Sequence, residues 1–158
     1  MLNQIDKIAT IKSIPWFHGL SAESTHQLLE VAEFRSIEYD EVVFAEGAQN
    51  ASLYLILTGR IQVESLIPGH GMLPIYFAEP LDVIGWSSLT PVVRHNPCCA
   101  RGLEKSRLLA FQAKKLEYFC EINHDLGYII MRRLANIVAS SMLNHRLKLL
   151  GLISGDIP

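Results

Sequence analysis

The chain is poor in the residues that build redox, metal and catalytic sites, and these shortages exclude several classes of protein. Only three cysteines occur among 158 residues, and two of them are adjacent. So few thiols cannot form a disulfide framework, and they favour a reducing, cytoplasmic location. The six histidines are dispersed and form no His-x-His pair, and the sequence has no phosphate-binding glycine motif or serine nucleophile elbow. We therefore expect a protein that is not an enzyme, with a cupin-like metalloenzyme the least favoured alternative.

The sequence also lacks an excess of charge of either sign and any long apolar run. Lysine and arginine total 14 against 16 acidic residues, which gives a net charge of −2. This balance leaves no basic footprint for nucleic acid or an anionic membrane. No segment approaches the roughly 18 apolar residues of a membrane span, and the N-terminus lacks the apolar core of a signal peptide. A hydrophobic content of 49% favours a folded soluble domain.

The first 33 residues predict two helices. An apolar face at three-residue spacing comprises Leu2, Ile5, Ile8 and Ile11. Pro15 interrupts this face, and Ser21 is a candidate N-cap for a second helix over residues 22–33. We therefore expect two helices before residue 34.

Residues 34–111 predict a β-roll of about eight short strands. Segments 52–57 and 60–65 are rich in β-formers and flank a tight turn at Thr58-Gly59. Residues 67–72 form a second turn cluster, after which Leu73 opens another strand. Turns at near-regular intervals are typical of jelly rolls and related double-stranded β-helices.

The remaining residues, 112–151, predict a short helix over 113–122 and a long one from Leu126 to about Leu150, which Gly151 stops. The long helix keeps an apolar face that is too extended for a free-standing surface helix. We expect part of it to pack on the roll and the rest to form a homodimer through residues 126–150. The whole is then one α+β domain with no DNA-binding domain of its own.

This order of elements and glycines resembles the cyclic-nucleotide-binding domain family, in particular the sensor domain of the catabolite-activator type of bacterial regulator. Residues 46–63, EGAQNASLYLILTGRIQV, resemble the early roll with its turn glycines Gly47 and Gly59. MRRLANIVASSM resembles the long dimer helix. The resemblance extends over residues 14–150 and implies a stand-alone regulatory domain that binds a cyclic nucleotide such as cAMP, or another small anion.

The phosphate-binding cassette of this family reads glycine-glutamate-hydrophobic-small-leucine, followed by arginine-serine/threonine-alanine. The matching residues here are Gly85-Trp86-Ser87-Ser88-Leu89 through Asn96-Pro97-Cys98. The resemblance therefore places Trp86 at the glutamate that accepts from the ribose, and Asn96 at the arginine that grips the phosphate. An indole only donates hydrogen bonds and an amide carries no charge. Arg94, two residues upstream, is the cation that a shifted loop would supply.

Two functions remain open from these residues. In the first, the chain is a sensor that signals through its C-terminal helix to a protein effector, with ligand contacts from Gly85, Trp86, Ser87, Ser88, Arg94, Asn96, Pro97, Cys98 and Ser141. In the second, the roll is a degenerate dimerisation or docking module whose pocket Trp86 fills. The same residues then have structural roles: a turn glycine, capping serines, solvated loop residues, a largely inert thiol and a small helix residue.

Overall fold

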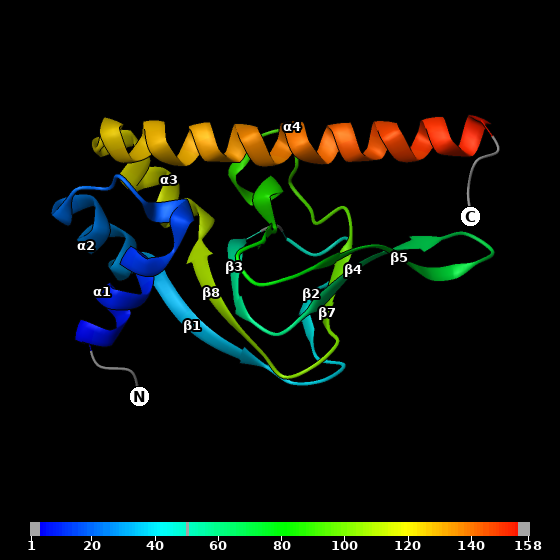
Figure 1. The fold of residues 1–158 in the computed structure, drawn as a ribbon, viewed down its shortest axis with the longest axis horizontal. Helices are drawn as coiled ribbons and strands as arrows, with labels where there is room; N and C mark the ends of the chain where they lie inside the picture. Colours follow the sequence, from blue (N-terminus) through cyan, green and yellow to red (C-terminus); the bar gives the residue numbers. More distant parts are fainter. Residues whose placement is uncertain (1–3, 50, 155–158) are drawn as a thin grey trace.

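Two four-stranded antiparallel sheets form a β-roll, with short helices at one end and a long helix along one side (Figure 1). The computed structural model describes residues 4–49 and 51–154. The first sheet has the order β1 (Ala32–Ile37), β8 (Ser106–Gln112), β3 (Ser52–Thr58) and β6 (Val83–Ile84). The second has the order β2 (Val42–Phe44), β7 (Cys99–Gly102), β4 (Ile61–Ile67) and β5 (Gly71–Ala78). The predicted α+β roll is confirmed.

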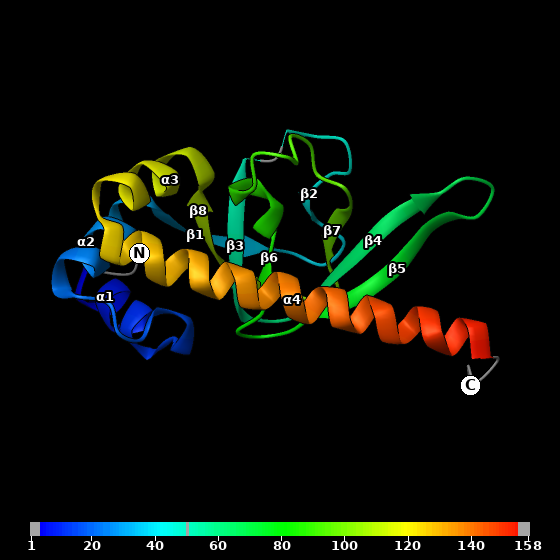
Figure 2. The same cartoon turned by 90° about the horizontal axis from the view of Figure 1, so that it is seen from above.

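The predicted tight turn at Thr58-Gly59 connects two strands of different sheets. β3 ends at Thr58 in the first sheet, and β4 begins at Ile61 in the second. The turn therefore carries the chain across the roll and does not close a hairpin. The true hairpin is β4–β5, where Ile61 pairs with Ala78 and Ile67 with Gly71. This hairpin extends beyond the rest of the roll (Figure 2).

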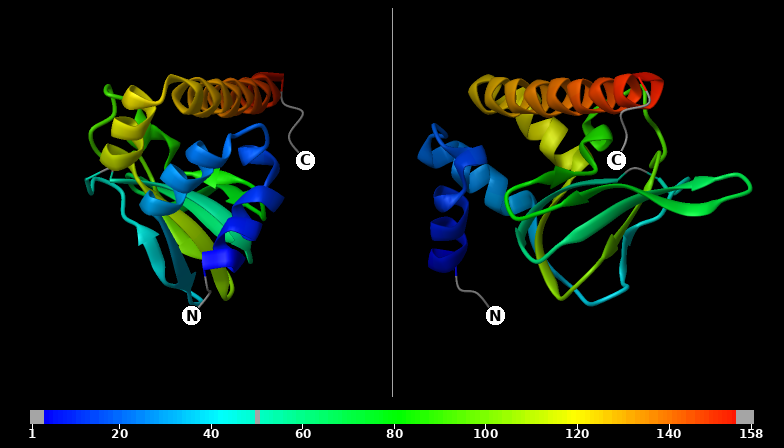
Figure 3. Two further views of the ribbon diagram at one scale, coloured as in Figure 1. Left: turned by 90° about the vertical axis from the view of Figure 1, so that its left-hand side faces the viewer. Right: turned by 45° about the vertical axis from the view of Figure 1, so that its right-hand side comes forward.

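The N-terminal helices gather at one end of the roll (Figure 3). They are α1 (Gln4–Ser13), the 3-10 helix η1 (Pro15–Phe17) and α2 (Ala22–Val31). Ser21 caps α2 as predicted, because its Oγ accepts a hydrogen bond from the Ser24 N–H at 3.0 Å. The helix ends before residue 33, since Ala32 already pairs with Phe111 of β8. Leu2 and the side chain of Ile5 lie outside the described part of the chain.

The C-terminal part consists of α3 (Ala113–Ile122) and α4 (His124–Ser154). Asn123 caps α4, because its Oδ1 accepts from the Leu126 N–H at 3.1 Å. The predicted stop at Gly151 is wrong, because this glycine lies inside α4. A glycine within a helix costs only about 1 kcal/mol relative to alanine, and the site of Gly151 is open, with no atom within 4 Å of an added Cβ. Within the described residues, no helix is both long and apolar enough to span a membrane.

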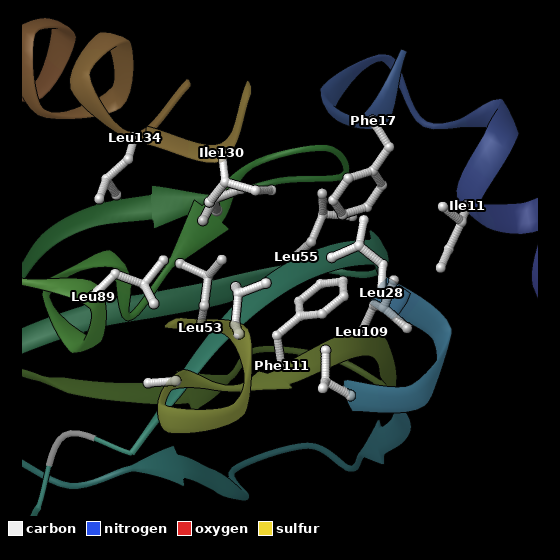
Figure 4. Close-up of a cluster of buried hydrophobic side chains, with 14 of the residues drawn as sticks. Ile11, Phe17, Leu28, Leu53, Leu55, Leu89, Leu109, Phe111, Ile130 and Leu134 are labelled. Atoms are coloured by element: carbon white, nitrogen blue, oxygen red, sulfur yellow. The ribbon is translucent and has the colours of Figure 1, made fainter. Parts of the chain in front are cut away.

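Two apolar clusters hold these elements together. One fills the space between the first sheet and the helices, and Figure 4 shows Phe17, Phe111 and Ile130 within it. The other lies between the two sheets and includes Ile37, Ile61, Ile84 and Leu108. Along α4, fully or nearly fully buried side chains are Leu126, Ile130 and Leu134. The first half of α4 is therefore part of the core, and its second half runs on beyond it.

Gly59 and Gly47 offer a matched test of the β3–β4 turn. Both have positive φ, +87° and +76°, so alanine at either position costs about 1–2 kcal/mol of backbone strain. A Cβ at Gly59 would also lie 2.6 Å from Ser106 Cα, whereas Gly47 has nothing within 4 Å. We expect Gly59→Ala to lower the free energy of unfolding by about 1–3 kcal/mol more than Gly47→Ala, measured by urea denaturation. Equal losses would contradict this close approach.

Candidate ligand-binding site

The cassette segment, defined here as residues 85–98, begins where β6 turns sharply away from the first sheet. Gly85 adopts φ +69° and N-caps the 3-10 helix η2 (Trp86–Leu89). A Cβ at this position would lie 2.6 Å from Ser52 O and 3.3 Å from the Tyr54 ring. Only glycine fits both the left-handed backbone and the close approach to β3. The Ser88 N–H donates to Gly85 O and the Thr90 N–H to Ser87 O, which closes the short helix.

A cavity of about 160 Å³, called here the cassette cavity, lies between the cassette segment, the roll and α4. Six of the nine predicted site residues line it: Gly85, Trp86, Ser87, Pro97, Cys98 and Ser141. The remaining wall comes from Phe44, Val63, Ile75, Tyr76 and His145. The structure thus brings the two ends of the cassette segment together and places α4 over them.

A second space of about 370 Å³, the α4 hollow, adjoins the cassette cavity. The two spaces share the walls Tyr76, Trp86, Ser141 and His145. Trp16, Asp82 and Lys148 line the hollow but not the cassette cavity. The half-buried indole of Trp86 therefore borders two spaces and leaves room on both sides.

Three predicted site residues do not line the cassette cavity. Ser88 and the exposed Arg94 line a separate hollow beside Gln49 and Glu117. Asn96 is only 5% exposed and is held by three hydrogen bonds. Its Nδ2 donates to Ala45 O, its N–H donates to Ala48 O, and its carbonyl accepts from the Gly47 N–H. Asn96 thus fixes the loop between β2 and β3.

The other nearby arginine, Arg101, is committed to a buried carboxylate. Its Nε lies 3.2 Å from Glu64 Oε1, and its guanidinium also lies 3.1 Å from Asp40 Oδ1. Glu64 is 4% exposed, so removal of Arg101 would leave a buried charge uncompensated. Among the described residues that line the cassette cavity, none is a lysine or an arginine.

Burial strengthens the preference of two ionisable groups of the cavity wall for their protonated forms. Burial raises the pKa of the Cys98 thiol to about 11, with further contributions from Glu46 and Cys99. Burial likewise raises the pKa of the Tyr76 phenol to about 12, helped by Cys98 and Asp82. Near pH 7 both side chains therefore keep their protons. They can donate weak or ordinary hydrogen bonds but bring no negative charge to the cavity.

Several residues of the cavity wall were not predicted from the sequence as site residues. His145 lies four residues after Ser141, and residues at that spacing share one face of a helix, so the prediction of Ser141 contained the signal for His145. Phe44, Val63 and Tyr76 come from three different strands. No local pattern links them, because their proximity depends on how the two sheets close into a roll.

The raised pKa of Cys98 predicts slow alkylation in the folded chain. In a Cys99→Ser/Cys120→Ser variant Cys98 is the remaining thiol. A shift from 9.0 to about 11 lowers its thiolate fraction at pH 8 about a hundredfold. We expect iodoacetamide to react roughly a hundredfold more slowly in buffer than in urea, and the rate in buffer to rise up to pH 11. A folded-state midpoint near pH 9, followed by mass spectrometry, would contradict this environment.

Comparisons with known proteins agree with this architecture. The sequence model of the cyclic nucleotide-binding domain family matches residues 34–123. A putative cyclic nucleotide-binding protein from Geobacter metallireducens GS-15 superposes with a TM-score of 0.75 at 21% identity, over 89% of this chain and 98% of that one. No match was found among curated protein sequences.

Two further solved structures come from regulators. The sensor domain of the transcriptional regulator DNR from Pseudomonas aeruginosa has a TM-score of 0.68 at 15% identity, over 82% of this chain and 91% of that one. The catabolite activator protein of Thermus thermophilus has a TM-score of 0.69 at 22% identity, over 87% and 63% of the two chains. Since the family match covers more than half of the sequence, and the predicted resemblance is confirmed, the chain belongs to the cyclic nucleotide-binding domain family.

Proposed function

We propose that this chain is a regulatory domain that binds a small ligand in the cassette cavity and transmits its presence through α4 to a protein effector. The observation that carries the proposal is the shared wall of the cavity. Trp86 and Cys98 come from the two ends of the cassette segment, and Ser141 and His145 come from α4. A ligand in this space contacts both the cassette segment and α4.

The two halves of α4 are held differently, which supports movement of its second half. Its first half is fixed by Leu126, Ile130 and Leu134, which are at most 6% exposed. Its second half reaches the roll through side chains such as Lys148, whose Nζ donates to Ile75 O at 3.0 Å. A ligand shifts such a helix only if it binds one arrangement better than another. Contacts to Ser141 and His145, beyond the anchored half, supply that difference.

Exposed apolar side chains on α4 support a homodimer through residues 126–150. A spacing of alternately three and four residues, or their sum, links Tyr128, Met131, Ala135, Val138, Met142 and Leu149. This spacing is that of a coiled-coil seam. Met142 is 73% exposed and the neighbouring Leu143 58%. A second copy of α4 would remove both side chains from water.

Trp86 provides the test of ligand binding. The chain has two tryptophans, so Trp16→Phe leaves Trp86 as the single reporter, and Trp86→Phe is the matched control. We expect one member of a panel of cyclic mononucleotides, cyclic dinucleotides and small neutral aromatics to change Trp86 emission saturably. The same compound should slow amide hydrogen exchange over residues 137–150. If no member changes emission or melting temperature, the sensor proposal fails and the docking-module alternative is favoured.

The proposed dimer is tested by the double variant Met142→Glu/Leu143→Glu. Both side chains are exposed, so the fold of the monomer should persist. Carboxylates facing each other across the seam should convert the dimer to a monomer in light scattering after gel filtration. Tyr39→Glu is the control, because Tyr39 is 75% exposed between β1 and β2, and these two strands are joined on the side of the roll opposite α4 (Figure 1). An unchanged dimer in the double variant would place the interface elsewhere.

A further inference from the structure

We infer that the cassette cavity takes a small uncharged aromatic molecule with one hydrogen-bonding group, not an anion. This inference rests on the proposed function, since it names the ligand class of the same site. It follows from three properties of the described cavity wall: its charge, its volume and its surface chemistry. Each property is independent of the others.

The charge of the wall disfavours an anion. Asn96 stands at the position of the expected arginine and is held by the loop at Ala45. Arg94 lines a different hollow, and Arg101 pairs with the buried Glu64. Pro97, which does line the cavity, has no backbone N–H to offer. Lys148 lines the adjoining α4 hollow, where its Nζ donates to Ile75 O. An anion buried in the cassette cavity would therefore lose its water without a lysine or arginine of the wall to pair with, which is unfavourable.

The volume of the cavity selects a single ring. Pockets for drug-sized ligands usually measure about 300–1,000 Å³, and the cassette cavity measures about 160 Å³. An engineered protein cavity of about 150 Å³ lined by apolar side chains binds benzene. A molecule of one ring therefore fits the cassette cavity, whereas a nucleotide requires movement of Trp86 or α4.

The surface of the cavity suits an aromatic ring. Three rings line it, those of Phe44, Tyr76 and Trp86, beside the aliphatic Val63 and Ile75. Aromatic rings stack or meet edge to face with a further ring. The Cys98 thiol, which is protonated near pH 7, adds a polarisable sulfur. Polar partners come from a few side chains, Ser87, Tyr76, Ser141 and His145, which matches a ligand with one hydroxyl or similar group.

Two fluorinated single-ring probes separate the uncharged ligand class from the anionic one, and 4-fluorobenzamide, which is uncharged and nearly isosteric with 4-fluorobenzoate, is the control for size. 4-Fluorophenol is neutral at pH 7 and 4-fluorobenzoate is anionic, and fluorine NMR of either reports binding to the full chain. We expect saturable binding of 4-fluorophenol, and binding of 4-fluorobenzoate at least about tenfold weaker because the anion loses its hydration without a paired cation. cAMP serves as the third probe, in direct binding and in competition.

A pair of variants locates the binding. Ser141→Phe places a ring on the α4 wall of the cassette cavity, and we expect it to abolish 4-fluorophenol binding. Ser140→Phe is the matched control, because Ser140 lines another space beside Pro15 and Arg133 and does not line the cavity. Circular dichroism establishes that both variants are folded. Cys98→Phe fills the cavity from the cassette side and replaces Ser141→Phe if that variant unfolds.

Each outcome of these measurements decides a different point. Binding of 4-fluorophenol that is lost in Ser141→Phe and kept in Ser140→Phe supports the inference. Equal or tighter binding of 4-fluorobenzoate or cAMP overturns the uncharged class and leaves the sensor proposal standing. Binding that survives both cavity-filling variants overturns the location. Absence of binding by all three probes and by the wider panel overturns both proposals.

Discussion

The placement of α4 depends on the side chain of one residue at its start. Asn123 Oδ1 caps the helix through the Leu126 N–H, while its Nδ2 donates to Ser24 Oγ and Gln27 Oε1 of α2. Its own N–H donates to Phe119 O at the end of α3. The side chain of Asn123 thus caps α4 and joins it to α2, while its backbone N–H bonds to α3, and together these bonds orient α4 as it leaves the core. Everything that α4 contributes to the cassette cavity, some 18 residues further along the helix, follows from that direction.

The electrostatics of the cassette follow from how each nearby cation is already used. Arg101 cannot turn to the cavity without abandoning Glu64, a carboxylate that is 4% exposed. Breaking a buried pair of this kind typically costs about 3–5 kcal/mol, more than most surface contacts return. Arg94 is free of that restraint, but the bonds of Asn96 to the 45–48 loop hold the chain that follows it. The described wall of the cavity therefore contains no arginine or lysine because the fold holds Arg94 and Arg101 elsewhere, although both lie near the cassette segment in the sequence.

Local patterns in the sequence predicted most of the helices and strands. Strand-forming runs, turn glycines and the Ser21 cap predicted the roll, α2 and α3, because hydrogen bonding and burial act on neighbouring residues there. What local patterns do not predict is which strands pair, because distant residues decide it. The Thr58-Gly59 turn joins different sheets because β3 pairs with β8 and β4 with β5 and β7. The same limit applies to the site. Gly85 and both ends of the cassette segment were predictable, whereas the position of Val63 in the cavity wall and the separation of Arg94 from the cavity depend on how the two sheets close into a roll.

Trp86 affects both the chemistry and the shape of the cassette cavity. In the family pattern this position carries a glutamate, and the position of Asn96 carries an arginine. Both positions are neutral in this chain: Trp86 lines the cavity, and Asn96 is bonded to the loop between β2 and β3. The indole also lies between two spaces, because it lines both the cassette cavity and the α4 hollow. A ring that simply filled a disused pocket would leave no space on its inner side, yet about 160 Å³ remains there. Trp86 therefore borders space on both sides, and under the proposed function its movement is the step that would enlarge the site for a larger ligand.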